Sequence, residues 1–263
     1  MTTENPQRAA DAPIPLAIWG PSSAGKTVLL AQLYLEIQSQ GGEWTIRPTA
    51  ESLKFIDRMQ EWRVNNRFPP ATPVGEPDRI VYVFHNQRTG VRASLQVEDR
   101  AGTDYEKQEP EARRRLNAAA GLVLLVDPFR EQRHLQLELR RLMDTMYVER
   151  EDARGRDPRP IAVCISKADV LIESPSDLER ARLDPDGFVR DRDCWNLVPL
   201  LERFCGNYRL FPVSGVGVNL NFGVVEPNIF YDESFRFRVG NRGIPFNLLA
   251  PFSWLIARIT DNT

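Results

Sequence analysis

The chain has 263 residues, of which 42% are hydrophobic and 27% are charged, and its formal net charge is −2. This composition is ordinary for a soluble protein that can bury a sizeable core, and it lacks the basic excess that a general nucleic-acid-binding role predicts. Three cysteines without C-x-x-C spacing and two histidines argue against a zinc site, and no apolar run approaches the roughly 18 residues of a membrane helix.

The N-terminal part of the chain is polar over residues 1–13, so we expect a disordered arm there rather than a signal peptide. Residues 14–263 are then predicted to form one domain. The run PLAIW (Pro15–Trp19) is short, apolar and followed by a glycine loop, as buried strands often are. KTVLLAQLYLEIQSQGG has helical spacing and ends at Gly41 and Gly42, a common helix stop.

The middle of the chain opens with a predicted insertion at about residues 44–78. It contains a short edge strand (EWTIRPT), a helix at about Glu51–Arg63 and a Pro-rich loop. The segment RIVYVFHNQRTGVRASLQVED then has the pattern of a β-hairpin with its turn at Gln87–Gly90. GLVLLVD, PIAVCIS and YRLFPVS predict three more buried strands, with helices around Leu135–Tyr147 and Asn196–Phe204.

This alternation of strands and helices predicts an α/β fold. We expect a three-layer sandwich whose sheet is mostly parallel, with one antiparallel edge strand supplied by the hairpin. A second insertion is predicted at about residues 216–245. It reads as a loop with a small hairpin in SFRFRVGNR, and its aromatic residues suit either a core or a partner surface. The segment APFSWLIARI is expected to form the closing helix.

GPSSAGKT follows the first predicted strand and has the phosphate-binding pattern G-x-x-x-x-G-K-[ST]. Gly20 and Gly25 allow a tight turn, and backbone N–H groups at the start of a helix attract an anion. Lys26 is expected to place a charge on the β- and γ-phosphates, and the Thr27 hydroxyl to ligate Mg²⁺. The predicted nucleotide-binding residues of this loop are Gly20, Pro21, Ser22, Ser23, Ala24, Gly25, Lys26, Thr27 and Val28.

Asp99-Arg100-Ala101-Gly102 forms a D-x-x-G motif at the end of the second hairpin strand. A carboxylate at this position can hold Mg²⁺ through water, and the Gly102 N–H can reach the γ-phosphate. The motif is short and arises easily by chance. Its position after a strand and behind the phosphate loop makes it fairly specific.

Ser166-Lys167-Ala168-Asp169 lies at the end of another predicted strand. The Asp169 carboxylate can accept hydrogen bonds from both N1–H and N2–H₂ of guanine, a donor pair that adenine lacks. Losing both bonds can discriminate by roughly 10⁴. The stem of Lys167 can cover the base and ribose. The sequence therefore favours GTP and GDP as ligands.

In this order the motifs resemble the translation-factor and Ras-like class of TRAFAC-type P-loop GTPases. The class also has a short guanine loop, for which PVSG supplies Ser214 and Gly215. GPSSAGKTVLLAQLY, FPPAT before the hairpin, and EPNIF with PFNLLAPFSWLI near the end are most similar to the bacterial double-GTPase group. That resemblance implies a role in a signalling or conflict module beside GTPase-activating and helical-repeat proteins, although this chain has room for one such domain.

Two positions depart from the class. Ser166 stands where the guanine motif starts with Asn or Thr, so we expect weaker affinity with specificity kept by Asp169. Thr103 stands where a Ras-like enzyme has a water-orienting glutamine.

The switch threonine, a ligand of Mg²⁺ and the γ-phosphate, has two candidates. Thr72 lies just before the hairpin, where the class places it, and is favoured over Thr49, which precedes a helix. Arg67 is a candidate arginine finger in cis, with Arg100 as a second one; the alternative for both is an exposed surface arginine. We expect intrinsic hydrolysis near or below roughly 10⁻⁴ s⁻¹.

The sequence thus predicts a cytoplasmic GTP-binding switch that hydrolyses GTP slowly with Mg²⁺ and is stimulated by a protein effector or activating partner. Two alternatives remain at this point. One is a nucleotide-bound scaffold without useful hydrolysis. The other is an ATPase or small-molecule kinase, for which the SKAD motif would have to be a coincidence.

Overall fold

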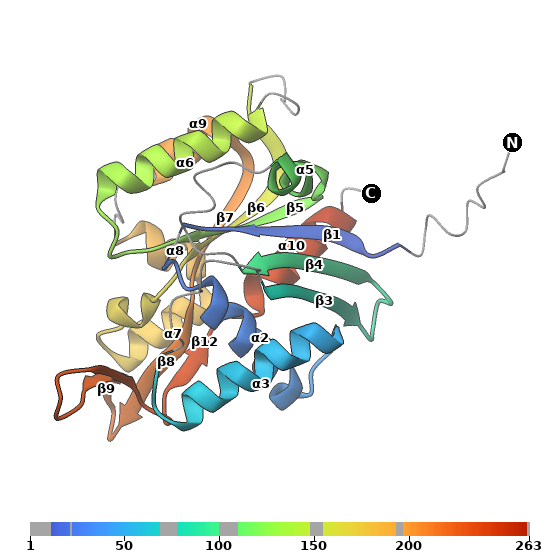
Figure 1. Cartoon of the computed structure of the whole chain (residues 1–263). Coiled ribbons are helices and arrows are strands. Elements are labelled where there is room, and N and C mark those ends of the chain that lie inside the picture. Colours follow the sequence, from blue (N-terminus) through green and yellow to red (C-terminus); the bar gives the residue numbers. More distant parts are fainter. Residues whose placement is uncertain are drawn as a thin grey trace, which may run out of the picture.

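A computed structural model of the chain describes residues 12–21, 23–68, 78–99, 110–147, 155–192 and 197–261. Its large sheet has seven strands in the order β2-β3-β4-β1-β5-β6-β7 (Figure 1). These strands are β1 (Ile14–Trp19), β2 (Trp44–Pro48), β3 (Asp78–Asn86), β4 (Arg92–Asp99), β5 (Gly121–Val126), β6 (Asp157–Ile165) and β7 (Cys205–Pro212).

Most neighbours in this sheet run parallel: β1 pairs in parallel with β4 and β5, β5 with β6, and β6 with β7. Strand β3 alone runs against the others, because it is antiparallel to both β4 and β2. The mostly parallel α/β fold is therefore confirmed, with one correction. The hairpin strand does not lie at the edge, because Trp44–Pro48 pairs outside it and takes the edge position.

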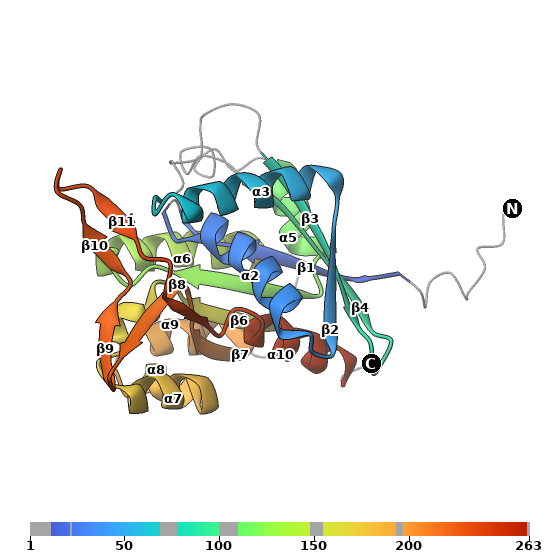
Figure 2. The ribbon, with the colours of Figure 1, turned by 90° about the horizontal axis from the view of Figure 1, so that it is seen from below.

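Helices cover both faces of the sheet, as Figures 1 and 2 show. They are α2 (Lys26–Gln40), α3 (Ala50–Val64), α5 (Pro110–Ala118), α6 (Gln132–Tyr147), α7 (Pro175–Leu183), α8 (Pro185–Arg190), α9 (Leu197–Phe204) and α10 (Ala250–Thr260), with a 3₁₀ turn, η1 (Ala168–Leu171). Side chains of α2, α3 and α10 form one core cluster with the sheet. Those of α6, α7, α8 and α9 form a second cluster on the other face.

Local sequence explains where several helices begin and end. Gly41 ends α2 in the left-handed conformation (φ 55°), as its predicted stop requires. Thr49 caps α3 by accepting a hydrogen bond from the Ser52 N–H at 3.2 Å. The hydrophobic pattern of the sequence predicted neither α7 nor α8, which are short and rich in charged residues.

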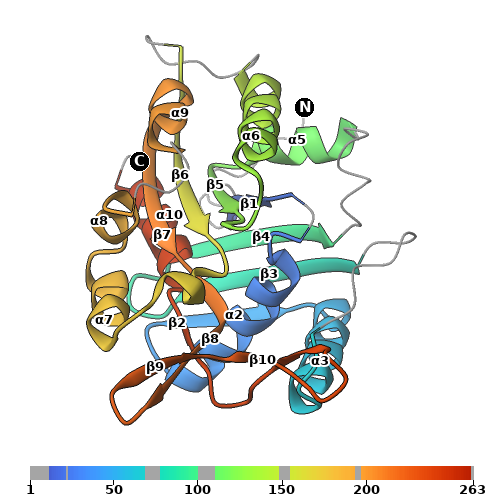
Figure 3. The same cartoon turned by 90° about the vertical axis from the view of Figure 1, so that its left-hand side faces the viewer.

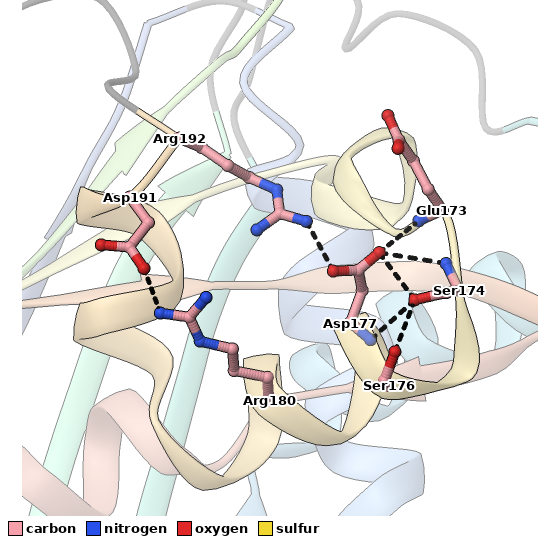
Figure 4. Close-up of polar contacts among 7 residues, drawn as sticks. All are labelled: Glu173, Ser174, Ser176, Asp177, Arg180, Asp191 and Arg192. Carbon is pink, nitrogen blue, oxygen red and sulfur yellow. Dashed lines mark hydrogen bonds and ion pairs between the residues drawn. The ribbon is translucent and has the colours of Figure 1, made fainter.

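Helices α7 and α8 are instead fixed by a polar network (Figure 4). Ser174 and Asp177 form a capping box at the start of α7, with Pro175 in the first turn. The Arg192 guanidinium donates to the other oxygen of Asp177 at 2.8 Å. Partial burial raises the pKa of Asp177, but the hydrogen bonds from Arg192, Ser174 and the Glu173 N–H outweigh it and hold the pKa below its usual value.

The predicted C-terminal insertion contains more β structure than the expected loop with one small hairpin. A hairpin is present, but only its second strand lies in SFRFRVGNR, because Phe237–Val239 pairs with Ile229–Tyr231. Strands β8 (Ser214–Asn221), β9 (Val224–Pro227) and β12 (Ile244–Phe246) form one antiparallel sheet, and β10 (Ile229–Tyr231) pairs with β11 (Phe237–Val239). We call residues 214–246 the β extension. The hairpin in it reaches the end of α3, where the Val239 N–H donates to the Asn66 carbonyl at 3.4 Å (Figure 2).

Two further sequence expectations concern the described part of the chain. Cys164 and Cys205 are both free and buried, in keeping with reduced thiols. None of the helices in the described ranges is long and apolar enough to cross a membrane.

Candidate functional site

The phosphate loop joins the end of β1 to the start of α2. A Cβ atom at Gly20 would lie 2.8 Å from Cβ of Leu125, so glycine is needed where the loop passes β5. Ser23 (φ 65°) and Gly25 (φ 84°) both adopt the left-handed conformation. Such turns direct successive backbone N–H groups into a concave anion site, and here the start of α2 adds its helix dipole.

Lys26 lies inside this loop and is 6% exposed. Its ammonium donates to the carbonyls of Gly20 at 2.6 Å and Pro21 at 2.9 Å. The loop therefore holds the cation in place through its own backbone. Ala24 is fully buried, and Thr27 and Val28 follow in the first turn of α2. Ser22 lies outside the described residues.

A second loop follows β6 and contains Asp169, which is 7% exposed. Its carboxylate accepts a hydrogen bond from the Ser214 hydroxyl at 2.6 Å. The same hydroxyl oxygen accepts a hydrogen bond from the Gly217 N–H at 2.8 Å, so the Ser214 hydroxyl is used both as a donor and as an acceptor. Burial raises the pKa of Asp169, while the hydrogen bond from Ser214 and the nearby Lys167 charge oppose the rise. A buried carboxylate in this state gains from further hydrogen-bond donors.

The two loops contact each other and the start of the β extension. A Cβ atom at Gly25 would lie 4.0 Å from Cβ of Ser166. Ser166, which directly follows β6, is held against the end of the neighbouring strand β5, since its hydroxyl donates to the Val126 carbonyl at 3.1 Å. A Cβ atom at Gly215 would lie 2.8 Å from Cγ1 of Val28. The predicted residues from the phosphate loop and from the two later motifs thus lie at one end of the sheet (Figure 3).

Lys167 is held between two residues that the sequence did not assign to the site. Its ammonium forms an ion pair with Asp127 at 2.7 Å and lies 5.6 Å from the ring centroid of Phe129. Asp127 directly follows β5, where the end of a buried strand could have marked it as a site residue. Its partner is 40 positions away, and only the parallel pairing of β5 with β6 brings the two together.

The switch candidates are described only in part. Thr49 serves as the cap of α3 and shares a hydrogen bond with the Ser52 hydroxyl at 2.8 Å. Arg67 is exposed, just after Asn66. Asp99 is the last residue of β4. Thr72, Arg100, Gly102 and Thr103 lie outside the described residues.

The donor set fits a metal ion bound mainly by phosphate oxygens. Across the described residues, no three His, Cys, Asp or Glu side chains are grouped to hold a metal ion. Mg²⁺ at nucleotide sites needs only one or two protein oxygens, because phosphates and water supply the rest. A hydroxyl such as that of Thr27, directly after a buried lysine in an anion-binding loop, is a ligand of that kind.

Comparison with known families and structures agrees with this arrangement. The family model described as Double-GTPase 2 matches residues 14–186. No curated protein matches the chain. Among solved structures, the S. cerevisiae Ski7 GTPase-like domain bound to GTP has a TM-score of 0.50 at 14% identity, covering 99% of this chain and 53% of that one.

The same Ski7 domain bound to GDP and inorganic phosphate gives a TM-score of 0.52 at 15% identity, over 97% of this chain and 52% of that one. A small COPII coat GTPase SAR1 from Encephalitozoon cuniculi, in complex with GDP, has a TM-score of 0.43 at 17% identity, covering 95% of this chain and 81% of that one. The chain spans about half the length of the Ski7 structures that it matches. At these identities the Ski7 structures support the fold.

Proposed function

Since the chain belongs to the Double-GTPase 2 family, we propose that it is a guanine-nucleotide switch that binds GTP and Mg²⁺ and hydrolyses GTP slowly. The family and the GTPase-like fold support GTP binding. Slow hydrolysis, stimulation by a protein partner, a cytoplasmic location and a role in a signalling or conflict module complete the proposal.

The observation that carries this proposal is the buried Asp169 carboxylate, held by Ser214 on a loop that touches the phosphate loop. Its two oxygens can accept the paired N–H groups of guanine, and the neighbouring loop can bind phosphate through backbone N–H groups. An adenine base offers no matching donor pair. A base reader and an anion site at the same end of the sheet therefore favour a guanine nucleotide over ATP.

Each remaining site residue has a proposed part. Lys26 places its charge at the phosphates, and the residues from Gly20 to Val28 supply the backbone cradle. Mg²⁺ would be held by Thr27, by Thr72 and, through water, by Asp99, and it neutralises phosphate charge. Ser166 and Lys167 line the base site with Asp169, and Gly215 packs against α2 beside them. Gly102 and Arg67 are proposed to act on the transferred phosphate.

The test is competitive binding of GTP, GDP, ATP and XTP in the presence of Mg²⁺, with the wild type and Asp169→Asn. We expect GTP and GDP to win in the wild type, and the variant to lose guanine affinity by about 10²–10⁴-fold and to turn toward xanthine. Asp191→Asn, which removes an exposed carboxylate paired with Arg180, serves as control. ATP binding equal to GTP binding and insensitive to Asp169→Asn would refute the proposal.

A scaffold without useful hydrolysis is the second candidate, favoured by Thr103 in place of a water-orienting glutamine. Single-turnover phosphate release separates the two. A switch should release phosphate near or below roughly 10⁻⁴ s⁻¹ alone and faster with a partner, whereas a scaffold should release none under either condition. Turnover above about 1 s⁻¹ by the protein alone contradicts both.

A further inference from the structure

The carboxylate of Asp127 is buried and takes part in two defined interactions. Its side chain is 7% exposed, while that of Lys167 is 36% exposed. One oxygen accepts the Phe129 N–H at 3.0 Å and closes a turn, and the other pairs with the Lys167 ammonium at 2.7 Å. A turn cap needs only the first of these bonds. The second bond joins the loop after β5 to the loop that contains Asp169.

Lys167 adopts a conformation that a flexible surface lysine would not need. Its backbone is left-handed (φ 53°, ψ 31°), and it directly precedes the η1 turn that contains Asp169. With its ammonium tied to Asp127 and its backbone fixed by η1, both ends of the four-carbon stem are held. The stem is therefore an ordered apolar surface beside the buried Asp169 carboxylate.

Phe129 completes this arrangement from the outside. It is 66% exposed, and its ring lies 5.6 Å from the Lys167 ammonium. At this distance a cation is attracted to the ring face. The loop after β5 thus contacts Lys167 with a carboxylate and an aromatic ring.

We propose that Asp127 is a positioning residue for guanine recognition, which holds the Lys167 stem in place as a platform for the base, and that Phe129 supports the ammonium end of that stem. This inference rests on the proposed function. It assigns a task in nucleotide binding to the loop after β5, which contains neither phosphate-binding nor base-reading motifs.

The test is the dissociation rate of a fluorescent GDP analogue from the full chain in Mg²⁺, measured for Asp127→Asn, Lys167→Met and the double variant. Asparagine keeps the acceptor for the Phe129 N–H and removes the charge that holds Lys167. Since an ordered lysine loses considerable rotamer entropy, we expect each single variant to dissociate roughly 10- to 30-fold faster. The double variant should differ from Lys167→Met by less than about twofold, because both changes break the same link.

A merely structural role for Asp127 predicts a different pattern, in which the two effects multiply. That result, or an unchanged dissociation rate in Asp127→Asn, would overturn the inference. Glu131→Gln is the matched control. It removes an exposed carboxylate that pairs with His134 and that belongs to the same loop as Asp127. Its dissociation rate should equal that of the wild type.

Phe129→Ala keeps the test decisive if Asp127→Asn does not fold, because this side chain is exposed. It should dissociate about two- to fivefold faster, and this effect should vanish in the Lys167→Met background. If the wild type binds the guanine analogue but the effects of the single variants multiply in the double variant, the inference is refuted and the proposed function is left intact. A wild type that binds no guanine nucleotide refutes both.

Discussion

A buried ion pair at the start of β6 should contribute strongly to stability. The Arg159 and Asp157 side chains are 5% and 6% exposed, and the guanidinium donates to both carboxylate oxygens, at 2.6 Å at closest. The third guanidinium nitrogen, Nη1, donates to the carbonyls of Leu116 at 2.6 Å and Ala119 at 2.9 Å, at the end of α5. One arginine therefore joins β6 to the carboxyl end of α5.

Arg159→Met would leave a buried carboxylate without its cation and two carbonyls without their donor. Breaking a buried pair from one side costs about 3–5 kcal/mol, which is a large part of the roughly 5–15 kcal/mol that stabilises a typical domain. The double variant Asp157→Asn/Arg159→Met removes the charge as well, so we expect it to recover about 1–3 kcal/mol of that loss.

Equilibrium unfolding in urea, followed by fluorescence of the five tryptophans and by circular dichroism, measures these differences. Arg190→Met is the control, since it breaks a pair with Asp186 that is 38% and 27% exposed and should cost less than about 1 kcal/mol. A loss below about 1 kcal/mol for Arg159→Met, or a double variant no more stable than the single one, would refute the reasoning.

Three further variants test other parts of the fold. Asp169→Asn should stabilise the nucleotide-free protein at pH 7 in thermal melts. Burial raises the pKa of Asp169 above its unfolded value of 3.8, so the wild type loses stability as pH rises from that value through the folded pKa, and the gain should be absent below about pH 3.8. Gly217→Ala should cost about 2–4 kcal/mol in urea, since φ is 74° and its Cβ would lie 2.2 Å from the Ile244 backbone; a loss below 1 kcal/mol would contradict this. Asp177→Asn should cost less than about 1 kcal/mol at pH 7 in urea, because this carboxylate lies near the surface and solvent screens its interactions. Since the pKa of Asp177 is lowered, its contribution is present above about pH 4 and is lost as pH falls through the folded value; an equal cost at pH 7 and in strong acid would be the contrary result.

The parts of the fold predictable from sequence depend on short-range patterns. GPSSAGKT needs only a preceding strand and a following helix to become an anion site, and both are visible in the neighbouring residues. The strand β5 reads as buried because all six of its residues are apolar or glycine, as expected for a strand covered on both faces. The position of Asp169 after β6 follows from the same logic.

What the sequence left open depends on partners far apart in the chain. Asp127 and Lys167 meet because β5 and β6 are neighbours. Arg159 in β6 meets Leu116 in α5, which is 43 positions away in the chain. Helices α7 and α8 lack a strong apolar period and are fixed by side-chain caps and charge pairs (Figure 4). The β extension was read as a loop because its strands are short and separated by Gly, Pro and Asn, so that their pairing is set by contacts such as those of Asn228.

The β extension is joined to the loop that contains Asp169 through its first strand. Ser214 is at once the hydrogen-bond partner of Asp169 and the first residue of β8. The amide of Asn228, which is 2% exposed, donates to the carbonyls of Val216 at 3.0 Å and Gly240 at 2.9 Å, and so fastens the β10–β11 end to β8. From there Val239 reaches the Asn66 carbonyl, one residue before Arg67.

This path lies mostly outside residues 14–186, the range that the family model matches. It connects Asp169, the proposed acceptor for the base, with the segment that leads to the expected switch threonine, through the Ser214 hydroxyl, backbone hydrogen bonds and one buried amide. The exposed aromatic residues Phe230, Tyr231 and Phe237 belong to the same β structure, and the rings of Tyr231 and Phe237 lie 4.3 Å apart between centroids with a tilt of 33°. Because the Asn228 amide joins β8 to the end of the β10–β11 hairpin, we expect Asn228→Ala to weaken the proposed nucleotide binding and to disturb the aromatic residues of the hairpin; unchanged GTP affinity in competitive binding would contradict this.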